Sequence, residues 1–454
     1  MRLNKMLLLI AIGQFGVMVA QDVRPNIIFI LTDDQRWDAL GYAGNTIIQT
    51  PEMDKLAHEG TYFKNAFVTT PICAASRATI MTGLYERKHN YTFQQPPLRE
   101  EFIKKSYFSL LKKAGYYNGF LGKFGVHFEK QLDTTLFDVY QPENQNGYYR
   151  LVNGATTHEH LTDKIGTNAI DFIKNSPRDA PFSLSISFHA PHAVDSSPNQ
   201  YFWPLATDSL YRDLKIPPAA ASTDADFEKL PKAVREGFNR TRWNWRYDTP
   251  EKYQKMVKGY YRMISGIDMA IGKIRASLEQ EGLAKNTIIV LMGDNGYFLG
   301  ERQMAGKWLM YEPSLRVPLI IYNPNHLNGA TIEDLVLNVD VPSTILDFAK
   351  VEIPDSYQGK SLVGYTNGNA IKQIDRTHFL CEHLWDFKPI ASSEGIRTKK
   401  YKYFRYTKEP FSEELYDLVQ DPTEKHNLAK LDQYKDVLKK LRETCDATID
   451  NLTE

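Results

Sequence analysis

The sequence predicts an α/β fold: a mostly parallel central sheet flanked by helices, followed by a smaller C-terminal α+β subdomain that carries an antiparallel sheet. The first observation is a set of continuous apolar runs, at 26–32, 117–121, 182–188 and 287–292. Such runs are typical of strands buried on both faces of a parallel sheet. The second observation is that helical patterns lie between the runs, notably at 163–174 and 253–279. This alternation predicts ligands beyond the carboxyl ends of the strands.

The third observation is a change of pattern after about Tyr365. Before it, residues 317–322 indicate one more strand and residues 338–349 a helix that begins near Pro342. After it, short segments at 377–382, 394–398 and 401–406 predict antiparallel strands. The chain then ends in an amphipathic helix, on whose apolar face Cys445 is expected to be a core residue.

The first twenty residues have the pattern of a secretory signal peptide, with Arg2 and Lys5 ahead of two apolar segments. As a membrane anchor the apolar stretch would be short, and Gln14 interrupts it. No other apolar stretch could span a bilayer, so we expect a secreted or periplasmic protein without stable membrane insertion. The domains expected are a signal peptide at 1–20, a catalytic domain at 22–365 and a C-terminal subdomain at 370–454.

The composition excludes some partners. The 55 basic and 55 acidic side chains cancel, so nothing global favours nucleic acid or an anionic membrane, and no nucleic-acid partner is expected. Any affinity for anions must therefore be local. The only cysteines are Cys73, Cys381 and Cys445, which cannot form a disulfide framework, although one bridge between Cys381 and Cys445 is possible.

Residues 70–83 form the segment around which the rest is organised. Pro71 precedes residues that all tolerate a helix, and Gly83 offers a left-handed stop, so Cys73 is expected at a helix N-terminus. Free backbone N–H groups there attract anions, and Arg77 stands on the same helical face as Cys73. Taken alone, the pair fits equally well a buried apolar cysteine beside a solvated arginine.

Oxygen ligands follow two of the predicted strands. Asp33 and Asp34 end the first run, and Asp294 and Asn295 end the last. Hard oxygen atoms suit Ca²⁺ or Mg²⁺ and suit Zn²⁺ poorly. Each pair alone is also a common turn, but their shared place at strand ends favours a metal site.

These segments resemble the motifs of type I sulfatases, which belong to the alkaline-phosphatase-like superfamily. Cys73, Ala75 and Arg77 match the signature in which the cysteine is oxidised to formylglycine by a formylglycine-forming enzyme. The resemblance implies that this group, with Asp33, Asp34, Asp294 and Asn295, holds a divalent cation, usually Ca²⁺, with Mg²⁺ possible. A hydrated aldehyde carries two hydroxyls, one to attack sulfur and one to expel sulfate afterwards.

The resemblance also implies a set of cationic side chains around the sulfate. Arg77 and Lys123 would steady the formylglycine, while His192 and Lys307 would contact the sulfate and one of the two would protonate the leaving alcohol. The sequence departs from the family at Gly125, where a histidine two residues after this lysine usually takes a proton when sulfate is expelled. We expect His127 to replace it.

The function expected is hydrolysis of a sulfate monoester on a carbohydrate, as in the secreted bacterial polysaccharide and glycosaminoglycan sulfatases that the sequence resembles. The rivals are a phosphonate or phosphate-ester hydrolase of the same superfamily and an inactive protein that binds sulfated glycans. In the long insertion at 193–250, Trp203, Trp243 and Trp245 are either sugar-stacking or core residues. Glu382, His383 and Trp385 are placed where they could reach a substrate hydroxyl.

Overall fold

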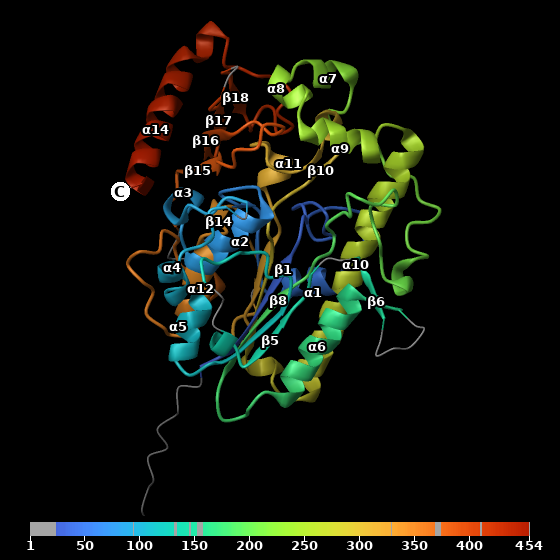
Figure 1. Cartoon of the computed structure of the whole chain (residues 1–454), viewed down its shortest axis with the longest axis vertical. Coiled ribbons are helices and arrows are strands. Elements are labelled where there is room, and N and C mark those ends of the chain that lie inside the picture. The colour runs from blue at the N-terminus through green and yellow to red at the C-terminus, as the bar shows by residue number, and fades with distance from the viewer. Residues whose placement is uncertain are drawn as a thin grey trace, which may run out of the picture.

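An eight-stranded sheet forms the centre of the fold (Figure 1). The computed structural model describes residues 24–93, 95–130, 134–144, 147–151, 158–327, 329–367, 374–408 and 411–453, so the signal peptide predicted at 1–20 lies outside the described residues. The strands follow the order β13 (Ala330–Ile332), β2 (Thr61–Phe63), β12 (Leu319–Tyr322), β9 (Thr287–Gly293), β1 (Asn26–Thr32), β8 (Phe182–Ser187), β4 (Tyr117–Gly122) and β5 (Val139–Pro142). The predicted mostly parallel sheet is confirmed, because β9, β1, β8, β4 and β5 all run parallel.

The central strand β1 sets the position of the polar residues that follow it. Every residue of β1, β8 and β9 is buried, and alternate residues of β1 enter two cores, one on each face of the sheet. Thr32 pairs with Gly293 in the parallel register. The next residue of each strand, Asp33 and Asp294, therefore emerges at the same edge of the sheet.

Helices cover both faces of the sheet, as Figure 1 shows. One face is covered by α1 (Pro51–Glu59), α6 (Leu161–Asn175) and α10 (Pro250–Gln280), and the other by α2 (Cys73–Thr82), α5 (Tyr107–Lys113) and α12 (Asp340–Phe348). The helices predicted at 163–174, 253–279 and 338–349 are confirmed as α6, α10 and α12. α10 begins at Pro250, and the side chain of Thr249 accepts a hydrogen bond from the Lys252 N–H, which is a favourable start for a helix.

Two strands at one side of the sheet interrupt the parallel pattern. β12 confirms the strand predicted at 317–322 and runs antiparallel to both β9 and β2. The sequence does not predict β2, because its three residues are too few to show a period.

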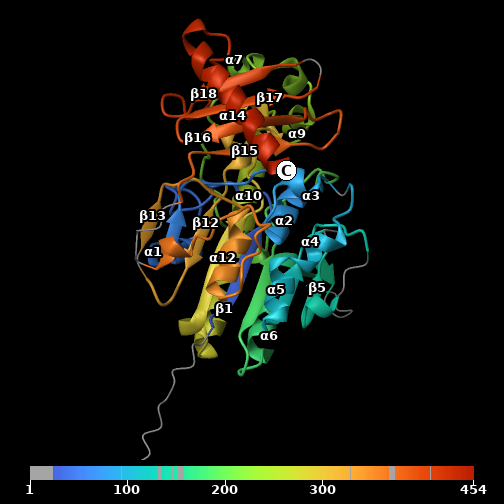
Figure 2. The ribbon, with the colours of Figure 1, turned by 90° about the vertical axis from the view of Figure 1, so that its left-hand side faces the viewer.

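A second sheet forms the top of the molecule in Figure 2, and it confirms the predicted antiparallel C-terminal part. Its order is β15 (His378–His383), β16 (Ser393–Thr398), β17 (Tyr401–Tyr406) and β18 (Glu413–Asp417), and α14 (Lys435–Thr453) packs on it. Cys381 and Cys445 are buried free cysteines, so the disulfide bridge that the sequence allows is not formed.

Buried polar contacts join this second sheet to the rest of the chain. The Glu414 carboxylate on β18 accepts hydrogen bonds from three tyrosine hydroxyls, those of Tyr311, Tyr406 and Tyr416. Lys402 on β17 is fully buried and pairs with Glu312 at 2.9 Å and with Glu424 at 2.6 Å. Tyr311 precedes, and Glu312 begins, the short helix α11 (Glu312–Leu315), which follows the site residue Lys307 closely in the chain, so the two parts share one interior.

The insertion at 193–250 packs as a covering element with short helices α7 (Asp224–Glu228), α8 (Lys232–Arg235) and α9 (Phe238–Arg246). Trp203 and Trp243 are partly buried beneath arginine guanidinium groups, whereas Trp245 is 38% exposed. Among the residues that the structure describes, no helix combines the length and the hydropathy needed to cross a membrane.

Candidate active site

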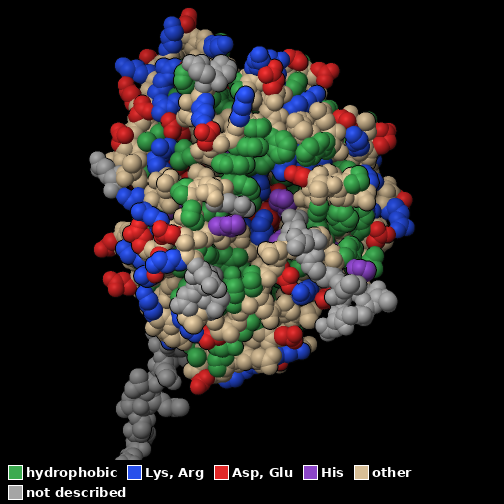
Figure 3. Space-filling view, viewed as in Figure 1, with side chains coloured by type: hydrophobic (Ala, Val, Ile, Leu, Met, Phe, Trp, Pro, Cys, Tyr) green, Lys and Arg blue, Asp and Glu red, His purple; other side chains and the backbone are tan. Residues whose placement is uncertain are grey.

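Nearly all the predicted site residues converge on one hollow beyond the carboxyl ends of β1, β9, β8 and β4. Figure 3 shows this hollow near the centre of the molecule, with Lys, Arg and His side chains inside it and hydrophobic side chains above it. The structure brings together Asp33, Asp34, Cys73, Arg77, Lys123, His192, Asp294, Asn295 and Lys307. His127 makes none of these contacts among the described residues.

Cys73 is the first residue of α2, as predicted. The preceding Ile72 is extended, with φ −142° and ψ 125°, and Gly83 ends the helix in the left-handed region with φ 69°. All ten residues of the helix are buried, and Cys73 is only 6% exposed. The thiol therefore stands at the positive end of a buried helix dipole, where an anion is stabilised.

The carboxylates form one wall of the hollow. Asp34 has φ 69°, its N–H donates to Asp294 Oδ1 at 3.1 Å, and the Asn295 amide donates to Asp34 Oδ1 at 2.6 Å. A ligand atom each of Asp33, Cys73 and Asp294 lie within 4.8 Å of one another. Asp33 Oδ1 and Asn295 Oδ1 are buried acceptors that receive no hydrogen bond from the described residues.

Cationic side chains face this wall. The Arg77 guanidinium lies 2.8 Å from Asp294 Oδ2 and 3.9 Å from Asp33 Oδ2, and it also donates to the Lys123 carbonyl at 2.7 Å. The ammonium groups of Lys123 and Lys307 pair with Asp33 and Asp34 respectively. His192 Nε2 lies 3.8 Å from Asp34 Oδ2.

Burial and the close spacing of charges shift the pKa values of these groups. Burial would raise the pKa of Asp33, but nearby cations, Lys123 foremost, hold it well below its ordinary value. Burial and then the charge of Asp33 raise the pKa of Asp294 to about 6, even though Arg77 opposes the shift. Burial lowers the pKa of His192, so its imidazole is neutral near pH 7. Lys307 stays charged, because Asp34 raises its pKa against the effect of burial.

The residues present fit a hard divalent cation. Three carboxylates crowd one buried spot, and the orphaned oxygen atoms of Asp33 and Asn295 are both acceptors rather than donors. Carboxylate and amide oxygens are the ligands that Ca²⁺ and Mg²⁺ prefer. Asp33, Asp34, Asp294 and Asn295 would hold the ion beside Cys73, and its charge would relieve the repulsion that raises the pKa of Asp294.

Calcium is expected to stabilise the folded chain. A cation held at about 100 times its Kd adds about 2.7 kcal/mol to the free energy of unfolding, which corresponds to about 3 °C in Tm for a chain of this size. Differential scanning fluorimetry in CaCl₂ against EDTA measures the shift. Asp294→Asn should lose most of it, whereas Asp171→Asn, on an exposed face of α6, should keep it. An equal shift in both variants would contradict a cation at this site.

Gly125 lies against Arg77 and Lys123, two residues before the exposed His127. The His127 side chain is exposed and makes no hydrogen bond or ion pair with any described residue, and its replacement of the family histidine stays a prediction. Gly125 has φ 72°, and a Cβ added there would lie 2.9 Å from Arg77 Cδ and 3.6 Å from Lys123 Cε. The backbone at Gly125 therefore packs directly against the Arg77 side chain, with no room for a Cβ atom.

Gly125→Ala is expected to lower kcat/KM about tenfold. The methyl group would push Arg77 from its carboxylate partners, and the positive φ adds strain of about 1–3 kcal/mol. Gly115→Ala is the matched control, because Gly115 also has a positive φ, of 84°, but its Cβ would meet nothing closer than 4.0 Å. Equal kinetics and equal Tm for the two variants would show that contact with Arg77 is unimportant.

The sequence did not point to two polar residues of the hollow. Ser187 is the last residue of β8, and its hydroxyl accepts a hydrogen bond from Arg77. Asp195 follows His192 by three residues, has a side chain 30% exposed, and pairs with the buried Arg242 and Arg246 of α9. A serine inside an apolar run and a lone aspartate in a loop carry no pattern that distinguishes them from structural residues.

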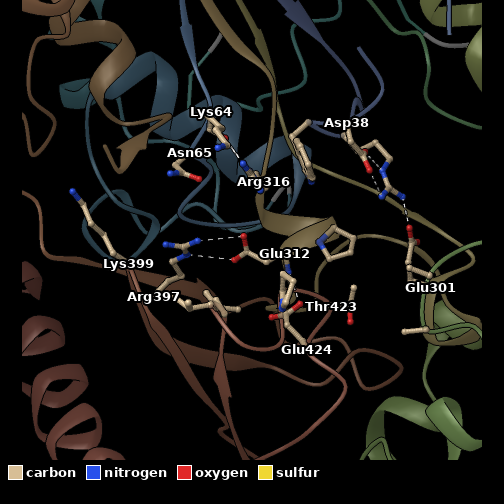
Figure 4. Close-up of a pocket in the computed structure, with 18 of the residues that line it drawn as sticks. Asp38, Lys64, Asn65, Glu301, Glu312, Arg316, Arg397, Lys399, Thr423 and Glu424 are labelled. Atoms are coloured by element: carbon tan, nitrogen blue, oxygen red, sulfur yellow. Dashed lines mark hydrogen bonds and ion pairs between the residues drawn. The ribbon is translucent and has the colours of Figure 1, made fainter. Parts of the chain in front are cut away.

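A separate cavity, of about 750 Å³, lies between the catalytic part and the C-terminal sheet (Figure 4). Its charged side chains pair with each other: Arg397 lies 3.4 Å from Glu312, and Arg36 lies 2.6 Å from Glu301. None of the predicted site residues lines this cavity. The predicted site residues lie instead at the hollow beside Cys73, where Asp33 Oδ1 and Asn295 Oδ1 receive no hydrogen bond from the described residues.

Comparisons with known proteins agree with this geometry. Residues 25–351 match the model of the family described as Sulfatase, and residues 300–451 match the model described as N-sulphoglucosamine sulphohydrolase, C-terminal. An arylsulfatase of Clostridium perfringens is 28% identical over 92% of this chain and 93% of its own length. An N-acetylglucosamine-6-O-sulfatase of Bacteroides thetaiotaomicron is 27% identical over 94% of this chain and 86% of its own.

Solved structures share the fold over almost the whole chain. A protein in complex with its substrate D-glucosamine-2-N,6-O-disulfate superposes with a TM-score of 0.80 at 25% identity, covering 95% of this chain and 98% of the other. The phosphonate monoester hydrolase of Agrobacterium radiobacter superposes with a TM-score of 0.79 at 22% identity, covering 94% and 96%. The second likeness concerns the fold alone.

Proposed function

This chain belongs to the sulfatase family, and from that premise we propose that it hydrolyses an O-sulfate ester on a poly- or oligosaccharide. It is a sulfuric ester hydrolase; the proposal concerns its substrate, its nucleophile and its cation. We propose a formylglycine made from Cys73 by a formylglycine-forming enzyme, a bound Ca²⁺ (or Mg²⁺), and action outside the cytoplasm, in the periplasm or in secreted form.

One observation carries the proposal: a cysteine at a buried helix N-terminus, with carboxylates on one side and cations on the other. The Asp33, Cys73 and Asp294 atoms lie within 4.8 Å of one another, and Arg77, Lys123 and Lys307 pair with the same carboxylates. Such a site neutralises an oxyanion next to the nucleophile without bulk water.

Each charged residue of the site has its own role in the proposed reaction. A bound cation would polarise the sulfate and favour the ionised hydroxyl of the nucleophile. Lys123 and Lys307 remain charged; Lys123, with Arg77, would steady the formylglycine, and Lys307 would hold the sulfate, while Arg77 also orients the acidic wall through Asp294. The His192 side chain is 19% exposed against 3% for Lys307, so His192 faces the exit of the hollow. Of these two groups Lys307 is the one that stays protonated near pH 7, so we assign to Lys307 the proton that the leaving alcohol needs, and to His192 a hydrogen bond to the sulfate near that exit.

The test is a combined measurement on protein made with a formylglycine-forming enzyme. The mass of the Cys73 peptide reports conversion, and ion chromatography reports sulfate released from glucosamine 6-O-sulfate, sulfated oligosaccharides and an aryl sulfate. Conversion with release from a saccharide is the expected result. Release of alcohol from a phosphonate ester alone would establish the rival hydrolase, and binding of sulfated glycan without any release would establish an inactive binding protein.

A further inference from the structure

Five aromatic side chains form a continuous band beside the hollow: Phe93, Phe238, Trp308, Trp385 and Phe387. Phe93 and Trp385 have ring centroids 4.7 Å apart, and Trp385 and Phe387 are stacked at 4.4 Å with an interplanar angle of 7°. The contacts continue from Phe387 to Phe238 at 6.3 Å and from Phe238 to Trp308 at 5.9 Å. Trp308 is buried, whereas the other four rings are half-buried and reach the surface.

The aromatic band begins at the nucleophile. Its rings pack around Ile72 and Ala75, which stand on either side of Cys73. Trp308 directly follows Lys307, and the backbone N–H of Trp308 donates to the Pro71 carbonyl at 3.0 Å. Figure 3 shows hydrophobic side chains gathered along the rim just above the hollow. The aromatic band therefore lies beside the nucleophile, where a group attached to a bound sulfate can contact it.

A fixed carboxylate stands at the edge of the aromatic band. Asp195 pairs with Arg242 and Arg246, and the Arg242 guanidinium lies 4.4 Å from the centre of the Trp308 ring and 5.1 Å from that of Phe238. These contacts restrain Asp195, whose side chain is 30% exposed. It is thus a held hydrogen-bond acceptor that water or a ligand can reach.

We propose that the aromatic band and Asp195 form the subsite for the sugar ring of the substrate. A pyranose combines an apolar face of C–H groups, which packs on aromatic rings, with hydroxyls at its edge that donate to a carboxylate. The cations of the hollow pair with the carboxylates and would bind the sulfate. The rest of the substrate would therefore contact the uncharged aromatic band. An aryl group would use the rings but not Asp195. The inference rests on the proposed saccharide sulfatase function.

The test measures binding, so that it does not depend on turnover. Isothermal titration calorimetry on Cys73→Ala protein, with glucosamine 6-O-sulfate and heparin- and ulvan-derived oligosaccharides, gives Kd for each. Trp385→Ala and Asp195→Asn, each in the same background, should raise the Kd of the tightest saccharide about tenfold. Trp203→Ala is the matched control, because Trp203 packs beneath Arg262 outside the band, and it should change Kd less than twofold.

The outcomes separate this inference from the proposed function. Unchanged Kd values in Trp385→Ala and Asp195→Asn, with Tm values showing that both are folded, would overturn the inference even if the enzyme releases sulfate from sugars. Failure of every saccharide to bind would overturn it as well. Absence of sulfate release from the converted wild-type protein would instead reject the proposed function, and the binding result would stand by itself.

Discussion

Cys73→Ala is expected to lower kcat/KM for sulfate release by about 10⁴-fold or more, which is the scale seen when a covalent nucleophile is removed. The side chain is small, so the free energy of unfolding should change by no more than about 1–2 kcal/mol. Sulfate release measured by ion chromatography, beside thermal unfolding, separates lost chemistry from lost folding. An Ala variant with near wild-type turnover would remove Cys73 from the mechanism.

Two companion variants sharpen this prediction. Cys73→Ser replaces the thiol by a single hydroxyl, which can attack sulfur but cannot expel the sulfate afterwards, so it should release at most one equivalent per site. Sustained turnover by the serine variant would contradict the need for formylglycine. Cys445→Ala changes a buried core cysteine on α14 and should retain kcat/KM while losing stability.

Arg77→Ala is expected to lower kcat/KM about 10³-fold and the free energy of unfolding by about 3–5 kcal/mol. Arg77 is almost completely buried and contacts the carboxylates of Asp294 and Asp33. Removing one partner of a buried ion pair leaves an uncompensated charge, which costs far more than the loss of a surface pair. Arg77→Lys keeps the charge but not the forked geometry, so it should recover stability better than activity.

The stability deficit of Arg77→Ala should grow with pH when chelator is present. The pKa of Asp294, about 6, lies above its ordinary value, so its proton is bound more tightly in the folded protein and ionisation costs stability as pH rises through 6. Loss of Arg77 raises that pKa further. Urea unfolding at pH 5 and pH 8 measures the difference, and Arg405→Ala, which breaks a partly exposed pair, should show a small deficit at both. A deficit larger at pH 5 would contradict this account.

Much of the fold could be predicted because its central strands are long and buried on both faces. Residues 26–32 and 287–292 contain mainly apolar side chains, so the ends of each run are clear. The first run corresponds to β1 and the second to β9. β2 and β5 could not be found in this way. Each is short and lies toward the side of the sheet, and its pairing depends on where distant strands fall.

The candidate site was predictable where residues sit at strand ends or helix starts, since the register then brings them together. Asp33 and Asp294 adjoin because Thr32 pairs with Gly293. Residues that act through tertiary packing gave no such signal: Asp195 is held by arginines from a helix that starts more than forty residues later. The role expected of His127 stays a prediction, because its exposed side chain contacts no other described site residue through a hydrogen bond or ion pair.

The shared interior around Glu414 and Lys402 also bears on how the protein is made. Tyr311 and Glu312 find their buried partners in residues that leave the ribosome near the end of translation. A nascent chain that lacks these partners leaves Tyr311 and Glu312 without their buried hydrogen bonds and ion pair. If Cys73 is converted to formylglycine, as we propose, the conversion must come before this interior closes, because the folded chain leaves Cys73 only 6% exposed.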